Sequence, residues 1–121
     1  MNYALGVATR LVNGDFTVQH LRALVLRLKG YQVDTASSLD EARNVISPSK
    51  YQLVIVDVGH FAGPELRFCE ELKKQYPHQK LLMQVDYHLF LFGNTCPDKV
   101  ISREEGPQHF IAEVEKALSA A

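Results

Sequence analysis

A short run of apolar residues, Leu53 to Val56, ends directly on an aspartate, Asp57. Three of its four residues are β-branched, which is typical of a parallel strand buried on both faces of a sheet. Parallel strands need long crossover connections, usually helices. This one segment therefore predicts an α/β fold with Asp57 at the carboxyl edge of a central strand.

Apolar and amphipathic segments alternate along the rest of the chain, as in an α/β domain with a parallel sheet. The expected strands are residues 3–8, 31–36, 53–57, 80–85 and 100–102. The expected helices are residues 17–29, a short one between Ser38 and Pro48, one from Pro64 to Tyr76, and one that Pro107 opens. Gly30 suits a left-handed helix cap, and the apolar stripe of the first helix is expected to comprise Leu21, Leu24, Val25 and Leu28.

Right-handed crossovers predict a flavodoxin-like, doubly wound sheet of five parallel strands in the order 2-1-3-4-5, with helices on both faces. The length of 121 residues fits one domain, residues 1–121. Ligands of such sheets bind at the carboxyl edge, near the switch between strands 1 and 3. The residues expected at this edge are Ala8, Thr9, Arg10, Asp57, Val85, Asp86, Ser102 and Arg103.

Charge and cysteine usage limit the classes of function. A net charge of −1 gives no basic excess, so direct nucleic-acid binding is not expected. No stretch approaches the roughly 20 apolar residues of a membrane helix, and no signal peptide is visible. Cys69 and Cys96 form no CxxC pair. They are interpreted as two reduced thiols in a cytoplasmic protein.

The chain resembles the receiver domain of two-component response regulators (CheY-like). The resemblance spans almost the whole chain and is best in residues 28–33, 38–43, 51–58 and 63–66. It implies that Asp57 occupies the phosphoacceptor position. It also implies two acidic residues after strand 1, a Ser or Thr after strand 4 and a Lys after strand 5. Those groups would hold Mg²⁺ and the phosphoryl group against the charge repulsion of the attacking carboxylate.

Most of these positions are changed. The acidic pair falls on Ala8 and Thr9, the hydroxyl position on Val85, and the lysine position on Arg103, or on Ser102 if the register slips by one. The resemblance is thus to a degenerate receiver, a pseudo-receiver, with no catalytic residue, no metal site and no cofactor. Two further hypotheses concern this edge. Arg10 or Arg103 would replace the metal charge by pairing with Asp57, or Asp86 and Asp15 would rebuild a Mg²⁺ site.

The sequence therefore predicts a non-enzymatic regulatory domain that acts on a protein partner, as a free-standing adaptor or as a piece of a longer regulator. One alternative is an atypical receiver that a histidine kinase still phosphorylates on Asp57. Another is a small flavodoxin-like ligand-binding protein, although no GxGxxG or GxxxxGK[ST] loop follows strand 1. A homodimer through the last strand and helix is also considered. Leu89, Phe90, Leu91 and Phe92 are expected to form an interaction surface if they are exposed. Alternatively, these side chains complete the hydrophobic core.

Overall fold

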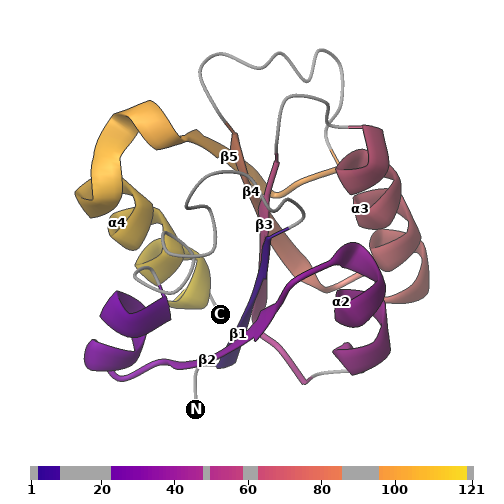
Figure 1. Cartoon of the computed structure of the whole chain (residues 1–121), viewed down its shortest axis with the longest axis horizontal. Helices are drawn as coiled ribbons and strands as arrows, with labels where there is room; N and C mark the ends of the chain where they lie inside the picture. The colour runs from indigo at the N-terminus through magenta and orange to yellow at the C-terminus, as the bar shows by residue number, and fades with distance from the viewer. Residues whose placement is uncertain (1–2, 9–22, 48–49, 59–62, 86–95, 120–121) are drawn as a thin grey trace.

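A five-stranded parallel sheet organises the chain, with helices on both faces (Figure 1). The computed structural model describes residues 3–8, 23–47, 50–58, 63–85 and 96–119. For residues 3–8, Arg103 and Ser119 it describes the backbone but not the side chain. The strands are β1 (Tyr3–Ala8), β2 (Gln32–Ala36), β3 (Leu53–Asp57), β4 (Lys80–Val85) and β5 (Lys99–Ser102). The helices are α2 (Leu39–Val45), α3 (Gly63–Gln75), the 3-10 turn η1 (Arg103–Glu105) and α4 (Gly106–Ser119). Residues 23–28 are also helical.

The strand order is β2-β1-β3-β4-β5, and all four pairings are parallel. This confirms the predicted doubly wound topology. The chain reverses its direction of winding between β1 and β3, so Asp57 at the end of β3 lies at the switch point where such folds bind ligands.

Two apolar layers hold the helices on the sheet, because successive residues of a buried strand face opposite sides. On one face, Val54, Val56 and Met83 pack against α2 and α3. On the other face, Leu53, Ile55 and Leu82 pack against residues 23–28 and α4. Figure 1 shows these two helical layers on opposite sides of the sheet. The strands are therefore apolar on both faces, which is why β3 reads as a continuous apolar run.

The apolar stripe predicted for the first helix is wrong at two of its four positions, while Val25 is half-buried and Leu21 lies outside the described residues. Leu24 is 50% exposed and Leu28 is 77% exposed, whereas Ala23 and Leu26 are buried against the sheet. The segment carries leucines on several sides, so its periodicity does not single out one face. The cap is as predicted: Gly30 has a φ of 96°. The Tyr31 N–H donates to the Leu26 carbonyl, closing the helix in a Schellman arrangement.

A serine begins α2 in the way that the sequence predicts. The hydroxyl of Ser38 accepts a hydrogen bond of 3.0 Å from the Glu41 N–H. The Glu41 carboxylate in turn accepts from the hydroxyl and the N–H of Ser37. These bonds lower the pKa of Glu41. The stabilisation that they provide is therefore present above the ordinary pKa of a glutamate and is lost as the pH falls through the lowered folded-state pKa.

Removal of the Ser38 cap is expected to destabilise the protein. We expect Ser38→Ala to lower the free energy of unfolding by about 1 kcal/mol, since one helix N–H loses its acceptor. Urea denaturation at neutral pH measures the change. Ser38→Asp is the matched control and should retain most of the stability, because a carboxylate also caps this position. Equal losses in both variants would show that the hydroxyl does not cap α2.

Within the described residues, no helix is both long enough and apolar enough to cross a bilayer.

Candidate functional site

Asp57 is the last residue of β3, the central strand, and its side chain is half-buried. Ile55, two residues earlier in the strand, packs in the layer of residues 23–28 and α4. Strand alternation therefore directs Asp57 to the same face of the sheet, at its carboxyl edge. The position is the one that the sequence predicts for a phosphoacceptor. The strand topology brings it there because β3 is flanked by β1 and β4.

The register identifies the two neighbours of Asp57. Ala8 of β1 lies level with it on one side, and Gln84 of β4 lies level with it on the other. Ala8 was predicted for this edge and stands where the family pattern places a carboxylate. Its methyl side chain supplies neither a negative charge nor an oxygen ligand. The edge of β1 beside Asp57 therefore contributes no carboxylate at this register.

Gln84 is a residue that the sequence reasoning did not single out. It is only 3% exposed, and its Oε1 has no hydrogen-bond partner among the described residues. A buried amide oxygen left in this state costs free energy, so it is a ready acceptor for a donor that reaches this edge. The signal was present in the sequence: Gln84 is the one uncharged polar residue of β4, which otherwise consists of Lys80 and four apolar residues.

The ends of β4 and β5 complete the described part of the edge. Val85 is the last residue of β4 and lies level with Ser102, the last residue of β5. The Val85 side chain is buried in the layer of α2 and α3. Ser102 is half-buried, its N–H donates to Glu105, and its hydroxyl accepts from the Glu104 N–H. Of the two candidates for the lysine position, Ser102 is therefore the strand-end residue, and Arg103 begins η1.

Several predicted residues lie outside the described part of the chain. They are Thr9, Arg10, Asp15, Asp86 and the whole of Leu89 to Phe92. The side chain of Arg103 is likewise not described. The hypotheses of an arginine partner for Asp57, of a rebuilt carboxylate site and of an interaction surface at residues 89–92 stay predictions.

The described donors do not fit a magnesium site. Mg²⁺ requires near-octahedral oxygen ligands and is bound through carboxylates. At this edge Asp57 supplies one carboxylate, Ala8 supplies no ligand, and Gln84 supplies a buried amide oxygen. Across the described residues, no group of three or more His, Cys, Asp or Glu side chains is placed to hold a metal ion.

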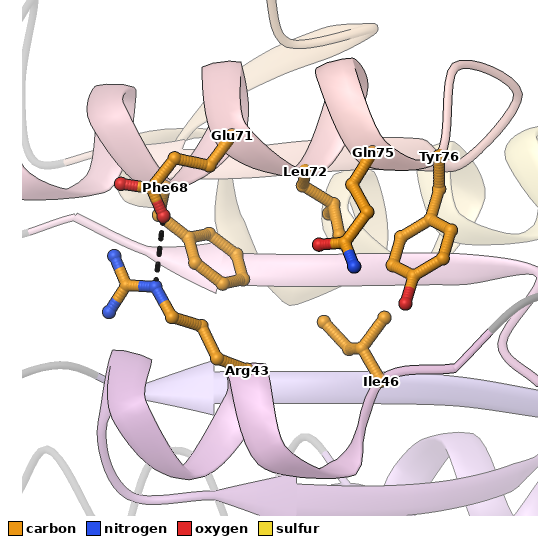
Figure 2. Close-up of a pocket in the computed structure, with 7 residues that line it drawn as sticks. All are labelled: Arg43, Ile46, Phe68, Glu71, Leu72, Gln75 and Tyr76. Carbon is orange, nitrogen blue, oxygen red and sulfur yellow. Dashed lines mark hydrogen bonds and ion pairs between the residues drawn. The ribbon is translucent and has the colours of Figure 1, made fainter.

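A cavity lies away from this edge. A cavity of about 100 Å³ opens between the C-terminal halves of α2 and α3 (Figure 2). The Arg43 Nε donates to Glu71 at 3.0 Å, and the guanidinium lies 5.5 Å from the centre of the Phe68 ring. Because the helices run antiparallel to the strands, this cavity lies towards the opposite edge of the sheet from Asp57. The other lining residues are Ile46, Leu72, Gln75 and Tyr76.

The interpretation of the two cysteines as separate reduced thiols is wrong. Cys69 of α3 and Cys96 are joined in a disulfide, with their Cα atoms 6.4 Å apart. The partners are separated by 27 residues, and only the packing of α3 beside the segment that enters β5 brings them together. The sequence shows no CxxC spacing, so it carried no signal for this pairing.

Comparison with known proteins gives structural matches only. No protein-family model matches the sequence, and neither does any curated protein. The regulator TrrA from Thermotoga maritima, solved with Mg²⁺-BeF, has a TM-score of 0.80 at 22% identity, covering 98% of this chain and 100% of that one. The non-phosphorylated receiver domain of HemR from Leptospira biflexa has a TM-score of 0.84 at 19% identity, covering 100% and 97%. This chain has the fold of a CheY-like receiver domain.

Further structures with the receiver fold agree. Chemotaxis protein CheY4 from Vibrio cholerae matches with a TM-score of 0.78 at 17% identity, over 98% of this chain and 99% of that one. TrrA has also been solved in complex with the histidine kinase ThkA, and that structure matches with a TM-score of 0.77. Asp57 lies at the carboxyl edge of the central strand of this fold, as the apolar run before it predicted.

Proposed function

We propose that this chain is a regulatory domain of the degenerate receiver type, which acts by binding a protein partner without Mg²⁺-dependent phosphorylation. The observation that carries the proposal is the register at the end of β3. Asp57 occupies the acceptor position, but its level neighbours are Ala8 and Gln84. The fold of a signalling domain is thus combined with an edge that lacks a described carboxylate pair.

The chemistry of phosphoryl transfer explains why these neighbours matter. A carboxylate that attacks a phosphate is repelled, and catalysis rests on positive charge that neutralises both groups. TrrA, with the same fold, has been solved with Mg²⁺-BeF. In this chain the hydroxyl position falls on the apolar Val85 at the end of β4, and the lysine position falls on Arg103, or on Ser102 at the end of β5 if the register slips by one. Val85 and Ser102 are both uncharged, and neither supplies positive charge to the edge.

We propose that the partner of this domain is a protein. TrrA was captured with the histidine kinase ThkA, so a receiver-type surface is suited to a folded protein. We propose a non-enzymatic role without direct nucleic-acid binding, in keeping with the net charge of −1. We retain the cytoplasm as the proposed location. In that reducing compartment the cysteine pair would be exposed to thiols.

The predicted absence of magnesium chemistry has a direct test. We expect millimolar Mg²⁺, alone and with beryllofluoride, to leave the amide NMR spectrum around residues 53–58 and 80–85 unchanged. Incubation with a small-molecule phosphodonor should give no aspartyl adduct by mass spectrometry. Asp57→Asn is the matched control, because it removes the acceptor with little change in volume. An adduct on the wild-type chain that this variant abolishes would establish instead the alternative of an atypical, phosphorylated receiver.

The assembly and ligand alternatives have separate readouts. A homodimer through β5 and α4 predicts twice the monomer mass in light scattering, with Val100, an exposed apolar residue of β5, at the interface. A small flavodoxin-like binding protein predicts that a flavin or nucleotide copurifies and absorbs in the visible or near-ultraviolet. Either result would change the proposed mode of action, whereas a monomer without chromophore supports the regulatory domain as stated.

A further inference from the structure

The disulfide lies where α3 meets the segment that leads into β5. Cys69 is fully buried in the layer of α2 and α3, and Cys96 is partly exposed at its margin. One helical turn beyond Cys69, Lys73 reaches the same segment and donates to Asp98 at 2.6 Å. Figure 1 shows the chain passing from beside α3 into β5. Residues 96–98 are therefore bound to α3 by one covalent link and one ion pair.

A second set of bonds holds Asp98 independently of the disulfide. Its carboxylate accepts a hydrogen bond of 2.7 Å from the Leu81 N–H, and its own N–H donates to the Leu81 carbonyl at 2.9 Å. Lys73 also donates to the Gln79 carbonyl. The start of β5 is thus attached to β4 and α3 through Asp98, whatever the state of the cysteines.

We propose that Cys69 and Cys96 form a redox modification site, a thiol–disulfide latch whose co-reactant is a small-molecule thiol–disulfide couple. In the oxidised state the latch fixes residue 96 to α3. In the reduced state residue 96 is released, while Asp98 keeps β5 in the sheet. The latch is independent of the function proposed for Asp57.

The reaction balances with a disulfide RSSR as oxidant. The Cys96 thiolate, the exposed member, attacks RSSR, so that a Cys96–SR bond forms and one RS⁻ leaves. The Cys69 thiolate then attacks the Cys96 sulfur and expels the second RS⁻. The two cysteine protons pass to the two RS⁻ groups, and the two electrons reside in the 2 RSH formed. Reduction is the same sequence in reverse, with 2 RSH as reductant.

The surroundings of the two sulfurs suit both states. Cys69 packs among Phe68, Leu72 and Leu81, and a buried thiol behaves there as a small apolar group, so reduction leaves no strongly polar atom in the core. Cys96 is within reach of solvent, so a small disulfide can approach it. Because Asp98 still bonds the segment to Leu81 of β4, reduction of the disulfide is expected to release residue 96 without unfolding the rest of the domain.

The test is a glutathione redox titration of the full chain, with thiols counted by alkylation and mass spectrometry. We expect the chain to pass from no free thiol to two free thiols in a single two-electron transition. The circular dichroism of the reduced form should remain that of a folded protein. A chain that shows two thiols under fully oxidising conditions, or that unfolds on reduction, would overturn the proposal.

Hydrogen exchange adds a readout that a purely structural disulfide would not give. In the wild-type chain, reduction should change amide exchange in β5, measured relative to amide exchange in β4, by less than about tenfold. In Asp98→Ala, which removes the carboxylate, reduction should accelerate the same amides by more than that factor. Asp98→Asn is the control, since its amide oxygen can still accept from Leu81, and it should fall between the two. Identical responses in the wild type and in Asp98→Ala would contradict the role given to Asp98.

Discussion

Cys96→Ser is expected to lower the free energy of unfolding by about 3.5 kcal/mol, because the disulfide closes a loop of 27 residues and restricts the unfolded chain. For a domain of this size the melting temperature should fall by roughly 10 °C or more. The variant should remain folded, because domains of this kind have unfolding free energies of about 5–15 kcal/mol. Thermal and urea denaturation under oxidising conditions measure the change.

The control for this prediction is the reductant. Wild-type chain in excess dithiothreitol should melt at the temperature of Cys96→Ser, and the variant itself should not respond to dithiothreitol. Cys96 is the better position to substitute, since Cys69 is fully buried and a hydroxyl there would add a desolvation cost of its own. Equal stability of oxidised wild type and variant would mean that the link does not restrict the unfolded chain.

Phe68→Ala is expected to cost about 3–5 kcal/mol, since it deletes a fully buried ring and leaves a cavity. Phe68 lies in the layer between the sheet and α3, and its ring faces the guanidinium of Arg43 (Figure 2). The new void would join the existing cavity between α2 and α3, to which Phe68 already contributes. Urea denaturation gives the loss as a shift of the midpoint.

Two variants separate the parts of this effect. Phe68→Leu keeps most of the apolar volume and should lose much less stability. Arg43→Met removes the charge above the ring, and the loss should be no more than about 1 kcal/mol, the scale of an exposed cation–π contact. A loss below about 1 kcal/mol in Phe68→Ala would show that α3 does not pack on the sheet through this ring.

The elements of this fold follow closely from local sequence. The five strands were predicted to within one residue, because segments buried on both faces are continuous apolar runs such as Leu53 to Val56. Ser38 marked a helix start because its hydroxyl can bond a backbone N–H, and Gly30 marked a helix end because glycine adopts a positive φ without strain. The helix α3 begins at Gly63, one residue before the proline that was expected to open it. The strand order followed from the handedness of crossover connections.

The first helix and the cysteine pair show where such reasoning stops. Leu24 and Leu28 were predicted to be buried and are exposed, because a segment rich in leucine presents apolar side chains on several sides. The partner of Cys69 is 27 residues away. A pairing of that kind depends on the position of α3 against the sheet, which no local spacing records.

The sequence likewise predicted some residues of the candidate site and missed another. The sequence predicted Asp57 at the acceptor position and Ala8 at a position where the family pattern has a carboxylate, and the register places the two residues side by side. It did not identify Gln84. A single glutamine in a strand is of interest only if it is buried and level with Asp57, and both properties come from the tertiary structure.

The order of apolar and polar residues along this chain was enough to determine its strands, its helix ends and its parallel topology, because each depends on the chemistry of neighbouring residues. The tertiary structure alone decided which leucines are covered, which cysteines meet and what lies beside Asp57. Those outcomes depend on distances between segments far apart in the chain, and such distances are set by the packing of the helices on the two faces of the sheet.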